Sequence, residues 1–177
     1  MTRESQIAVF GGGCFWCVEA CYARLRGVIS AESGYSGGHV DSPGYQLVCS
    51  GTTGHAEVVQ VTFDPAQISY DSLLEVFFTI HDPTTLNRQG EDVGTQYRSA
   101  IFYADEAQRA AAELAIARWA DHFADPIVTQ LAPLTRFWPA EDYHRAYFES
   151  HGHEPYCAYT VAPKVKKFVS RFAALLK

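Results

Sequence analysis

A glycine-rich turn that ends in a cysteine constrains this chain more than any other stretch. The apolar residues 7–10 predict a strand, and Cys14 follows that strand after three successive glycines. The residues beyond Cys14 have helical spacing, so Cys14 is predicted where a strand turns into a helix. Backbone N–H groups at a helix N-terminus stabilise a thiolate, and we expect the pKa of Cys14 to fall below about 8.5. The same pattern also fits a small cysteine that is simply buried.

Strand and helix patterns alternate along the whole chain, without a linker or an internal repeat. The predicted strands cover residues 7–10, 28–35, 56–63, 97–103 and 126–131, and the predicted helices cover 14–26, 69–81, 105–122, 140–150 and 163–176. The first six elements have the order β-α-β-β-α-β, which is typical of a ferredoxin-like plait. We therefore predict an α+β fold, a two-layer α/β sandwich in which this plait carries an added strand and C-terminal helices. The chain is predicted to form one domain, 1–177, with a flexible N-terminus at 1–6.

Composition and charge narrow the class of protein. The chain has 177 residues, of which 47% are hydrophobic and 19% charged, so it has enough apolar side chains for a core. Its formal net charge is −6, and no cluster of Lys or Arg precedes the last predicted helix, which argues against nucleic acid or a membrane as the partner. Residues 1–6 are polar, and no apolar run approaches 18 residues. We expect a soluble, cytoplasmic protein that acts as a monomer.

The cysteines indicate redox chemistry rather than structural cross-links. Five is an odd number, and four of the five lie in the first third of the chain, unlike the disulfide framework of a secreted protein. Cys21 falls on the apolar face of the first predicted helix and is expected to pack there. Cys14 and Cys17 lack a second ligand pair at zinc-finger spacing, so no metal is predicted.

If Cys14 is a nucleophile, its reaction needs a proton donor. Glu57 lies at the start of the strand predicted over 56–63. A carboxyl group at the edge of an apolar strand is either desolvated, and then partly protonated, or exposed and without a chemical role. Both interpretations remain open from the sequence.

Aromatic residues near Cys14 offer hydrogen bonds and an apolar pocket. Tyr45 and Tyr97 lie beside glycine-containing loops, where their hydroxyl groups either point at a developing oxyanion or simply reach the surface. Phe15 and Trp16 cannot both face the core from the first turn of a helix. At least one of them is therefore expected to line a pocket for an apolar group.

Separated motifs in this sequence resemble one known family. They are GCFW at 13–16, GYSGG at 34–38, VCSGTTGHAEVV at 48–59, HDP at 81–83 and GTQYRS at 94–99. Together, and in this order, they are similar to peptide methionine sulfoxide reductase A over nearly the whole chain. The resemblance implies reduction of the S epimer of methionine sulfoxide, free or in proteins.

The resemblance also implies roles for individual residues. By position, Cys14 matches the nucleophile of the family and Glu57 its proton donor. Tyr45 and Tyr97 match catalytic tyrosines that hydrogen-bond the sulfoxide oxygen. The substrate-binding residues that the resemblance implies are Phe15 and Trp16 around the methyl group, and Asp92 and His144 near the substrate. Oxygen transfer to Cys14 leaves a sulfenic acid, which a second cysteine must attack.

Two cysteines are candidates for this resolving step. Cys157 resembles the resolving cysteine of the family and lies in residues 151–162, which we expect to be mobile. Cys17 stands where the family motif usually has glycine, and it is the alternative because it lies one helical turn from Cys14. The resemblance implies that thioredoxin or another dithiol reduces the disulfide, without a bound cofactor.

Two other classes of protein remain open at this stage. The CxxC pattern of Cys14 and Cys17 also occurs in thiol–disulfide oxidoreductases of the thioredoxin type. Such an enzyme would need neither Glu57 nor the tyrosines. A peptide-binding module without catalytic activity would use the aromatic pocket alone.

Overall fold

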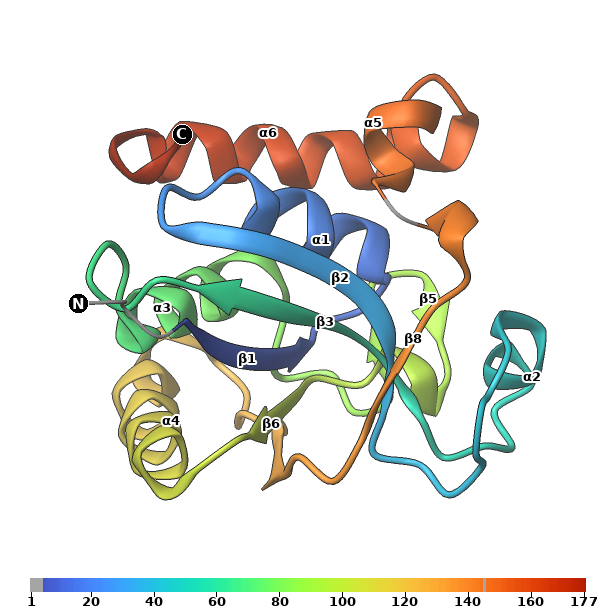
Figure 1. Ribbon diagram of the computed structural model, residues 1–177, viewed down its shortest axis with the longest axis horizontal. Helices are drawn as coiled ribbons and strands as arrows, with labels where there is room; N and C mark the ends of the chain where they lie inside the picture. The colour runs from blue at the N-terminus through green and yellow to red at the C-terminus, as the bar shows by residue number, and fades with distance from the viewer. Residues whose placement is uncertain (1–4, 145) are drawn as a thin grey trace.

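The computed structural model describes residues 5–144 and 146–177 (Figure 1). The strands are β1 (Gln6–Gly11), β2 (Val28–Ser36), β3 (Ala56–Phe63), β4 (Arg88–Gln89), β5 (Asp92–Val93), β6 (Ala100–Tyr103), β7 (Gln130–Pro133) and β8 (Phe137–Pro139). The α-helices are α1 (Phe15–Ala23), α2 (Tyr45–Cys49), α3 (Tyr70–Ile80), α4 (Glu106–Trp119), α5 (Tyr147–His151) and α6 (Ala162–Arg171). Short 3₁₀ turns cover Thr95–Tyr97, Ala120–His122, Asp142–His144 and Ala173–Leu175, and a π-helical segment covers Cys157–Val161.

The main sheet has the order β7-β6-β1-β3-β2-β8 in the described part of the chain. Its four central strands pair antiparallel in the order β6-β1-β3-β2, which is the arrangement expected when a β-α-β-β-α-β chain folds as a ferredoxin-like plait. β7 adds to one edge in parallel with β6, and β8 adds to the other edge antiparallel to β2. The predicted α+β plait is thus confirmed, with two added strands instead of one.

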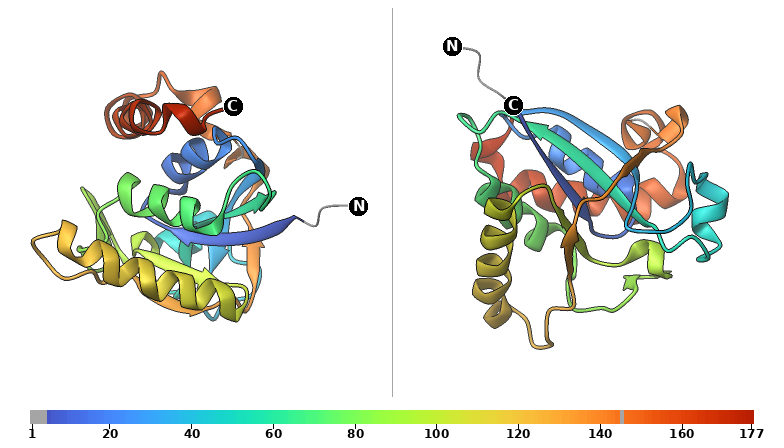
Figure 2. Two further views of the ribbon diagram at one scale, coloured as in Figure 1. Left: turned by 90° about the vertical axis from the view of Figure 1, so that its left-hand side faces the viewer. Right: turned by 60° about the horizontal axis from the view of Figure 1, so that its bottom comes forward.

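The helices cover one face of the sheet (Figure 2). α1 packs on β2 and β3, α4 packs beside α3, and α6 lies across α1 and α3. Because successive strand residues point to opposite faces, Phe10 joins the large core under the helices while Val9 joins a small apolar cluster on the other face. The partly buried side chains that pack against this second cluster are Ala132 of β7, Leu134, and Phe137 of β8. Two predicted helix starts are confirmed, since the side chains of Ser69 and Asp105 accept hydrogen bonds from backbone N–H groups of the first turns of α3 and α4.

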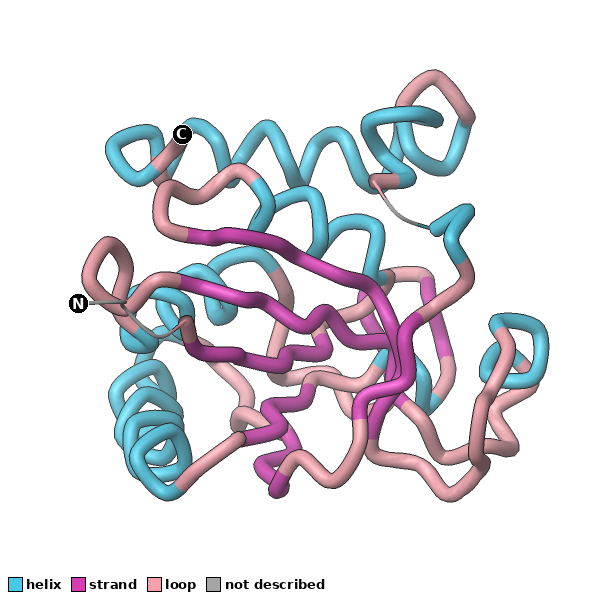
Figure 3. The backbone as a smooth tube through the Cα atoms, viewed as in Figure 1, coloured by secondary structure: helices cyan, strands magenta, loops and turns pink. Residues whose placement is uncertain are grey.

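Several predicted boundaries are wrong for local reasons (Figure 3). The strand predicted from residue 97 begins at Ala100, because Tyr97 ends a 3₁₀ turn. The helix predicted over 140–150 is divided, because the backbone of Ala146 is left-handed with φ of 50°. The strand predicted over 126–131 begins at Gln130, and the first helix ends at Ala23. No sequence pattern indicates β8 or α2, which have three and five residues.

The sequence predicts two flexible regions, residues 1–6 and 151–162. Of the N-terminal segment 1–6, residues 1–4 lie outside the described residues, and Gln6 begins β1. Residues 151–162 run from the end of α5 through the π-helical segment into α6, and their mobility stays a prediction. Across 5–144 and 146–177, every helix is too short or too polar to cross a membrane.

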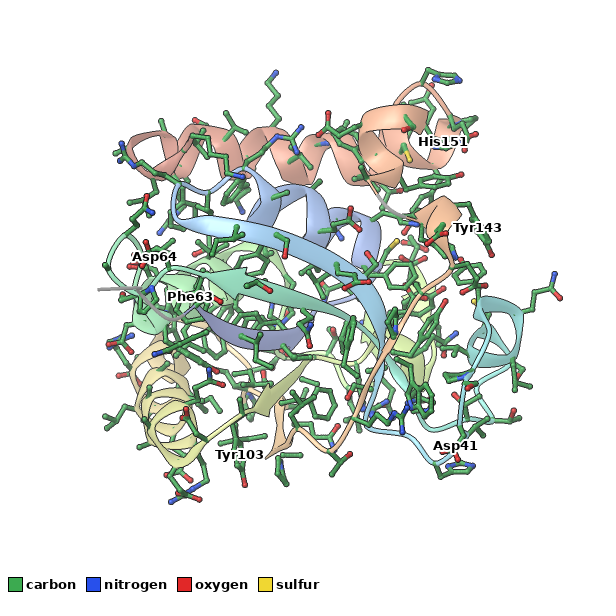
Figure 4. The ribbon with its side chains drawn as sticks, viewed as in Figure 1. Asp41, Phe63, Asp64, Tyr103, Tyr143 and His151 are labelled. Carbon is green, nitrogen blue, oxygen red and sulfur yellow. The ribbon has the colours of Figure 1, made fainter. Side chains whose placement is uncertain are left out.

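The topology gathers chain-distant residues at one end of the sheet. β1 runs antiparallel to β3 and β6, so the residues that follow β1 lie beside those that begin β3 and precede β6. Figure 4 shows this end at Tyr143, between β8 and α5, whereas Phe63 and Asp64 mark the opposite end of β3. Cys14, Glu57 and Tyr97 therefore meet although they are far apart in sequence.

Candidate active site

Cys14 is the N-cap residue of α1, as the glycine-rich turn predicts. Its backbone is extended, with φ of −60° and ψ of 125°, and its side chain is 7% exposed. Gly13 has φ of +93°, and a Cβ at this position would lie 2.7 Å from the side chain of Gln89. Only glycine fits such a turn without strain, so Gly13 fixes the path of the chain into Cys14.

Glu57 is buried beside this helix start. Its Oε1 accepts a hydrogen bond of 3.2 Å from the Phe15 N–H, and its Oε2 has no partner among the described residues. Burial raises the pKa of Glu57 from 4.5 to about 8, the charge of Asp92 adds to this, and the Phe15 N–H opposes it. The exposed alternative is therefore wrong. Glu57 holds a proton at neutral pH and has one free oxygen.

The expectation of a lowered pKa for Cys14 is also wrong in this arrangement. Burial raises the pKa of the thiol well above its ordinary value, and the nearby Glu57 and Cys17 act in the same direction. The Trp16 N–H at the helix start and the Tyr156 hydroxyl stabilise the thiolate, but they do not compensate. Desolvation penalises a charged group more than one helix terminus stabilises it. Cys14 is a protonated thiol as long as it stays covered.

Tyr45 and Tyr97 come together around one thiol. Tyr45 begins α2 and Tyr97 ends the 3₁₀ turn before β6, and both hydroxyl groups hydrogen-bond the half-buried Cys49. Burial and then the charge of Glu57 raise the pKa of both phenols, so both remain neutral hydrogen-bond donors. The two tyrosines and Glu57 thus form a group of neutral O–H donors.

Phe15 and Trp16 both contribute to an aromatic wall. The Phe15 ring is buried, with its centroid 5.0 Å from His144 and 6.2 Å from Tyr45. Trp16 is half-buried and stacks on Tyr147 at 3.9 Å. Its indole N–H donates a hydrogen bond of 3.0 Å to Nδ1 of His144. These aromatic rings form an apolar surface next to Cys14.

The two polar residues implied near the substrate have different surroundings. His144 is buried, burial lowers its pKa, and its Nε2 has no partner within the described chain. Asp92 begins β5, and its Oδ2 accepts a hydrogen bond of 2.6 Å from the Tyr156 hydroxyl. Asp92 therefore reaches the Cys14 thiol through Tyr156.

Both candidate resolving cysteines are buried close to this site. Cys157 has no exposed surface and Cys17 is 5% exposed, and all five cysteines are free thiols. Burial raises the pKa of Cys17 to about 11, Lys164 opposes the rise, and Asp92 and Cys157 add to it. Cys157 is thus close enough to Cys17 to affect its pKa. The residue before Cys157, Tyr156, contacts Cys14. Cys21 packs in the core, as predicted.

Two glutamates that sequence reasoning missed hold the site together. Glu141 accepts hydrogen bonds of 3.0 Å from the Tyr45 N–H and from the Tyr35 hydroxyl, and these lower its pKa although burial opposes the change. Glu19, in the middle of α1, is buried and accepts hydrogen bonds of 2.5 Å from the Ser33 hydroxyl and the Ala146 N–H. Glu19 therefore links α1 to Ala146, the residue before α5.

The missed residues gave only a weak signal in sequence. A glutamate within an apolar helix is the pattern that suggests Glu19, since a buried carboxylate needs partners from other elements.

Among residues 5–144 and 146–177, no group of three or more His, Cys, Asp or Glu side chains is placed to hold a metal ion.

Comparison with known proteins identifies the family. The family model described as peptide methionine sulfoxide reductase matches residues 6–175. The chain belongs to the peptide methionine sulfoxide reductase family. The peptide methionine sulfoxide reductase MsrA of Saccharolobus solfataricus is 55% identical over 172 residues, which are 97% of each chain. This membership decides against the thioredoxin-like and the non-catalytic alternatives.

Solved structures agree with the family assignment. The reduced form of Mxr1 from Saccharomyces cerevisiae has a TM-score of 0.81 at 34% identity, covering 87% of this chain and 90% of Mxr1. Mxr1 has also been crystallised in complex with Trx2, and that structure has a TM-score of 0.57 at 22% identity, covering 83% of this chain and 89% of the other. At 22% identity, the likeness to Mxr1 in the Trx2 complex shows the shared fold alone.

Proposed function

We propose that this reductase acts on methionine S-sulfoxide, free or in proteins, with Cys14 as the nucleophile and Glu57 as the proton donor. The observation that carries this assignment is the buried Glu57 beside the start of α1, whose pKa is raised to about 8 and whose Oε2 has no partner among the described residues. A sulfoxide oxygen becomes a leaving group only when it is protonated. A carboxyl group with a pKa of about 8 supplies that proton at neutral pH.

The remaining residues bind and polarise the sulfoxide. Tyr45 and Tyr97 would turn their hydroxyl groups from Cys49 to the sulfoxide oxygen, where negative charge accumulates. Phe15 and Trp16 would surround the methyl group, and their aromatic faces exclude water from the reacting sulfur. Asp92 and His144 would line the side of the pocket nearer the C-terminal segment.

The oxygen then moves from one sulfur to the other. The Cys14 sulfur attacks the sulfoxide sulfur, the S–O bond of the substrate breaks, and the oxygen remains on Cys14 as a sulfenic acid. A thiol and a sulfoxide give a sulfenic acid and a thioether, so no proton is gained or lost overall. Glu57 gives its proton to the oxygen and recovers one from the thiol.

Cys157 is the resolving cysteine in this proposal, with Cys17 as the alternative. Its thiol attacks the sulfenic acid, water leaves, and a disulfide with Cys14 forms. Cys157 directly follows Tyr156, whose hydroxyl hydrogen-bonds the Cys14 sulfur, so its segment is already attached to the nucleophile. Cys17 lies between the two in the first turns of α1 and is a competing thiol.

Recycling needs an external dithiol, and we assign this role to thioredoxin. The complex of Mxr1 with Trx2 supports the choice, since Mxr1 is 34% identical to this chain in its reduced form. The protein would need no bound cofactor. Its net charge of −6 supports the absence of nucleic acid or an anionic membrane as a partner, and we propose that it acts as a monomer in the cytoplasm.

Single-turnover reduction tests the assignment. A Cys14→Ser variant should release no methionine from stoichiometric sulfoxide, because a hydroxyl is a far weaker nucleophile at neutral pH. Cys21→Ser, in the same helix, should release it as the wild type does. A Cys157→Ser variant should still release one equivalent but form no fast disulfide. Methionine release by Cys14→Ser, or a Cys14–Cys17 disulfide that forms at the wild-type rate in Cys157→Ser, contradicts the respective role.

A further inference from the structure

The side chain of Tyr156 reaches from the C-terminal segment into the site. Its hydroxyl donates a hydrogen bond of 2.6 Å to Oδ2 of Asp92 and also hydrogen-bonds the Cys14 sulfur. Its ring stands edge-on to Trp16, with 5.8 Å between centroids. Tyr156 therefore contacts the nucleophile, an implied substrate residue and the aromatic wall at once.

The position of Tyr156 determines where Cys157 points. The backbone of Tyr156 is helical, with φ of −61° and ψ of −48°, so the side chains of neighbouring residues diverge by about 100°. Residues that follow each other in a helix do not face the same partner. While Tyr156 lies on Cys14, the thiol of Cys157 is directed elsewhere and is completely buried.

The segment around Tyr156 has further attachments and one irregular stretch. Tyr147 stacks on Trp16, and its hydroxyl donates a hydrogen bond of 2.8 Å to Glu154. The π-helical segment Cys157–Val161 begins directly after Tyr156. π-helical stretches are rare and occur frequently at functional sites. Tyr147 and Tyr156 attach the segment to the site next to the point where its helix becomes irregular.

We propose that Tyr156 is a latch that keeps Cys157 away from Cys14 until a sulfoxide binds. This inference rests on the proposed roles of Cys14 and Cys157. The incoming sulfoxide takes the place of the Tyr156 hydroxyl next to the Cys14 sulfur, and the bond to Asp92 is lost with it. The released segment then rotates and brings Cys157 to the sulfenic acid. The Cys14 S–O bond breaks, the Cys14–Cys157 S–S bond forms, and the hydroxyl leaves as water with the thiol proton of Cys157.

The latch explains the order of the two reactions. Premature attack of Cys157 is prevented because its thiol is turned away. The order of events, first oxygen transfer and then disulfide formation, follows from one side chain.

Thiol labelling of the reduced protein tests the latch. Tyr156→Phe keeps the ring but removes both hydrogen bonds of the hydroxyl. Loss of one bond to a charged group shifts an equilibrium by about 10- to 100-fold. We expect iodoacetamide to alkylate Cys157 faster by this factor, as followed by mass spectrometry.

Two controls separate release of the latch from general loosening. Tyr159→Phe makes the same chemical change in the same segment, at a side chain that is 83% exposed, and should leave the rate at Cys157 unchanged. Cys21, buried in α1, is an internal reference that should not become more reactive. If Cys157 is no faster in Tyr156→Phe, or if Cys21 accelerates equally, the latch is refuted.

A second measurement tests whether substrate opens the latch. In a Cys14→Ser background, methionine sulfoxide should accelerate alkylation of Cys157, and Tyr156→Phe should abolish that acceleration because the segment is already free. No effect of sulfoxide in the presence of Tyr156 overturns the proposal. Single-turnover methionine release by the wild-type protein is measured in parallel. Failure of that release overturns the proposed function, whereas failure of the labelling with normal release overturns the latch alone.

Discussion

Replacement of Glu57 by glutamine should slow the reductase step but make the protein more stable at alkaline pH. A free carboxyl group has a pKa of 4.5, and burial raises that of Glu57 to about 8 in the folded protein. The folded state therefore binds a proton that the unfolded state releases between these values. Stability from this group is complete below pH 4.5 and is lost as the pH rises to about 8.

The size of the effect follows from the two pKa values. Each pH unit between them costs the wild type about 1.4 kcal/mol, which gives an upper limit of about 5 kcal/mol over the interval. Glutamine does not titrate, and its amide oxygen can still accept the Phe15 N–H. Its NH₂ group would take the place of Oε2, which has no partner among the described residues, at a cost of about 1–3 kcal/mol. We expect Glu57→Gln to be less stable than the wild type at pH 5 and more stable by about 2–4 kcal/mol at pH 9.

Urea unfolding of both proteins at pH 5 and pH 9, in the presence of a reductant and followed by tryptophan fluorescence, measures the difference. Glu75→Gln, at an exposed position on α3, should show no such dependence on pH. The reasoning fails if the difference between Glu57→Gln and the wild type changes by less than about 1 kcal/mol between the two pH values. A constant difference would mean that Glu57 is ionised in the folded protein at neutral pH, and that it cannot be the acid.

Three further outcomes are expected. The single-turnover reductase rate of the wild type should fall about tenfold per pH unit above 8, as Glu57 loses its proton, and Glu57→Gln should be slower by about 10²–10⁴ at pH 7, without this alkaline decline. In the same assay, Tyr45→Phe and Tyr97→Phe should each reduce the rate by about tenfold, less than Glu57→Gln, because each removes one of several hydrogen bonds to the oxygen. Glu19→Ala should lower the free energy of unfolding in urea by about 2–4 kcal/mol, because the buried Ser33 hydroxyl and the partly buried Ala146 N–H lose their acceptor.

The sequence predicted those parts of the fold that depend on local pattern. The β-branched residues of β3 and the apolar spacing of α3 follow from burial of these elements in the core, and both lie where the sequence pattern places them. β8 was missed because three residues that pair at a sheet edge have no periodicity of their own. The break at Ala146 depends on a left-handed backbone that the sequence does not announce.

The sequence also predicts the position of Cys14, but not the burial of the residues around it or their pKa values. The position of Cys14 at a helix start follows from glycines and spacing, but its pKa depends on how deeply the fold buries it, and a hydrogen bond that acts on it comes from Tyr156, 142 positions later. The burial of Glu57 was an open choice, because a residue at the start of a strand can lie on either side of the boundary with solvent. Glu141 and Glu19 act on partners from other elements, so neither has a signature of its own.

The covered, protonated thiol of Cys14 also bears on selectivity among oxidants. Hydrogen peroxide oxidises a cysteine through its thiolate, at a rate that depends on the thiolate fraction and on solvent access. Cys14 is 7% exposed and its pKa is raised, so both factors are small in the resting protein. The proposed nucleophile is thereby shielded from the oxidants that produce methionine sulfoxide, and its thiol is kept for the substrate.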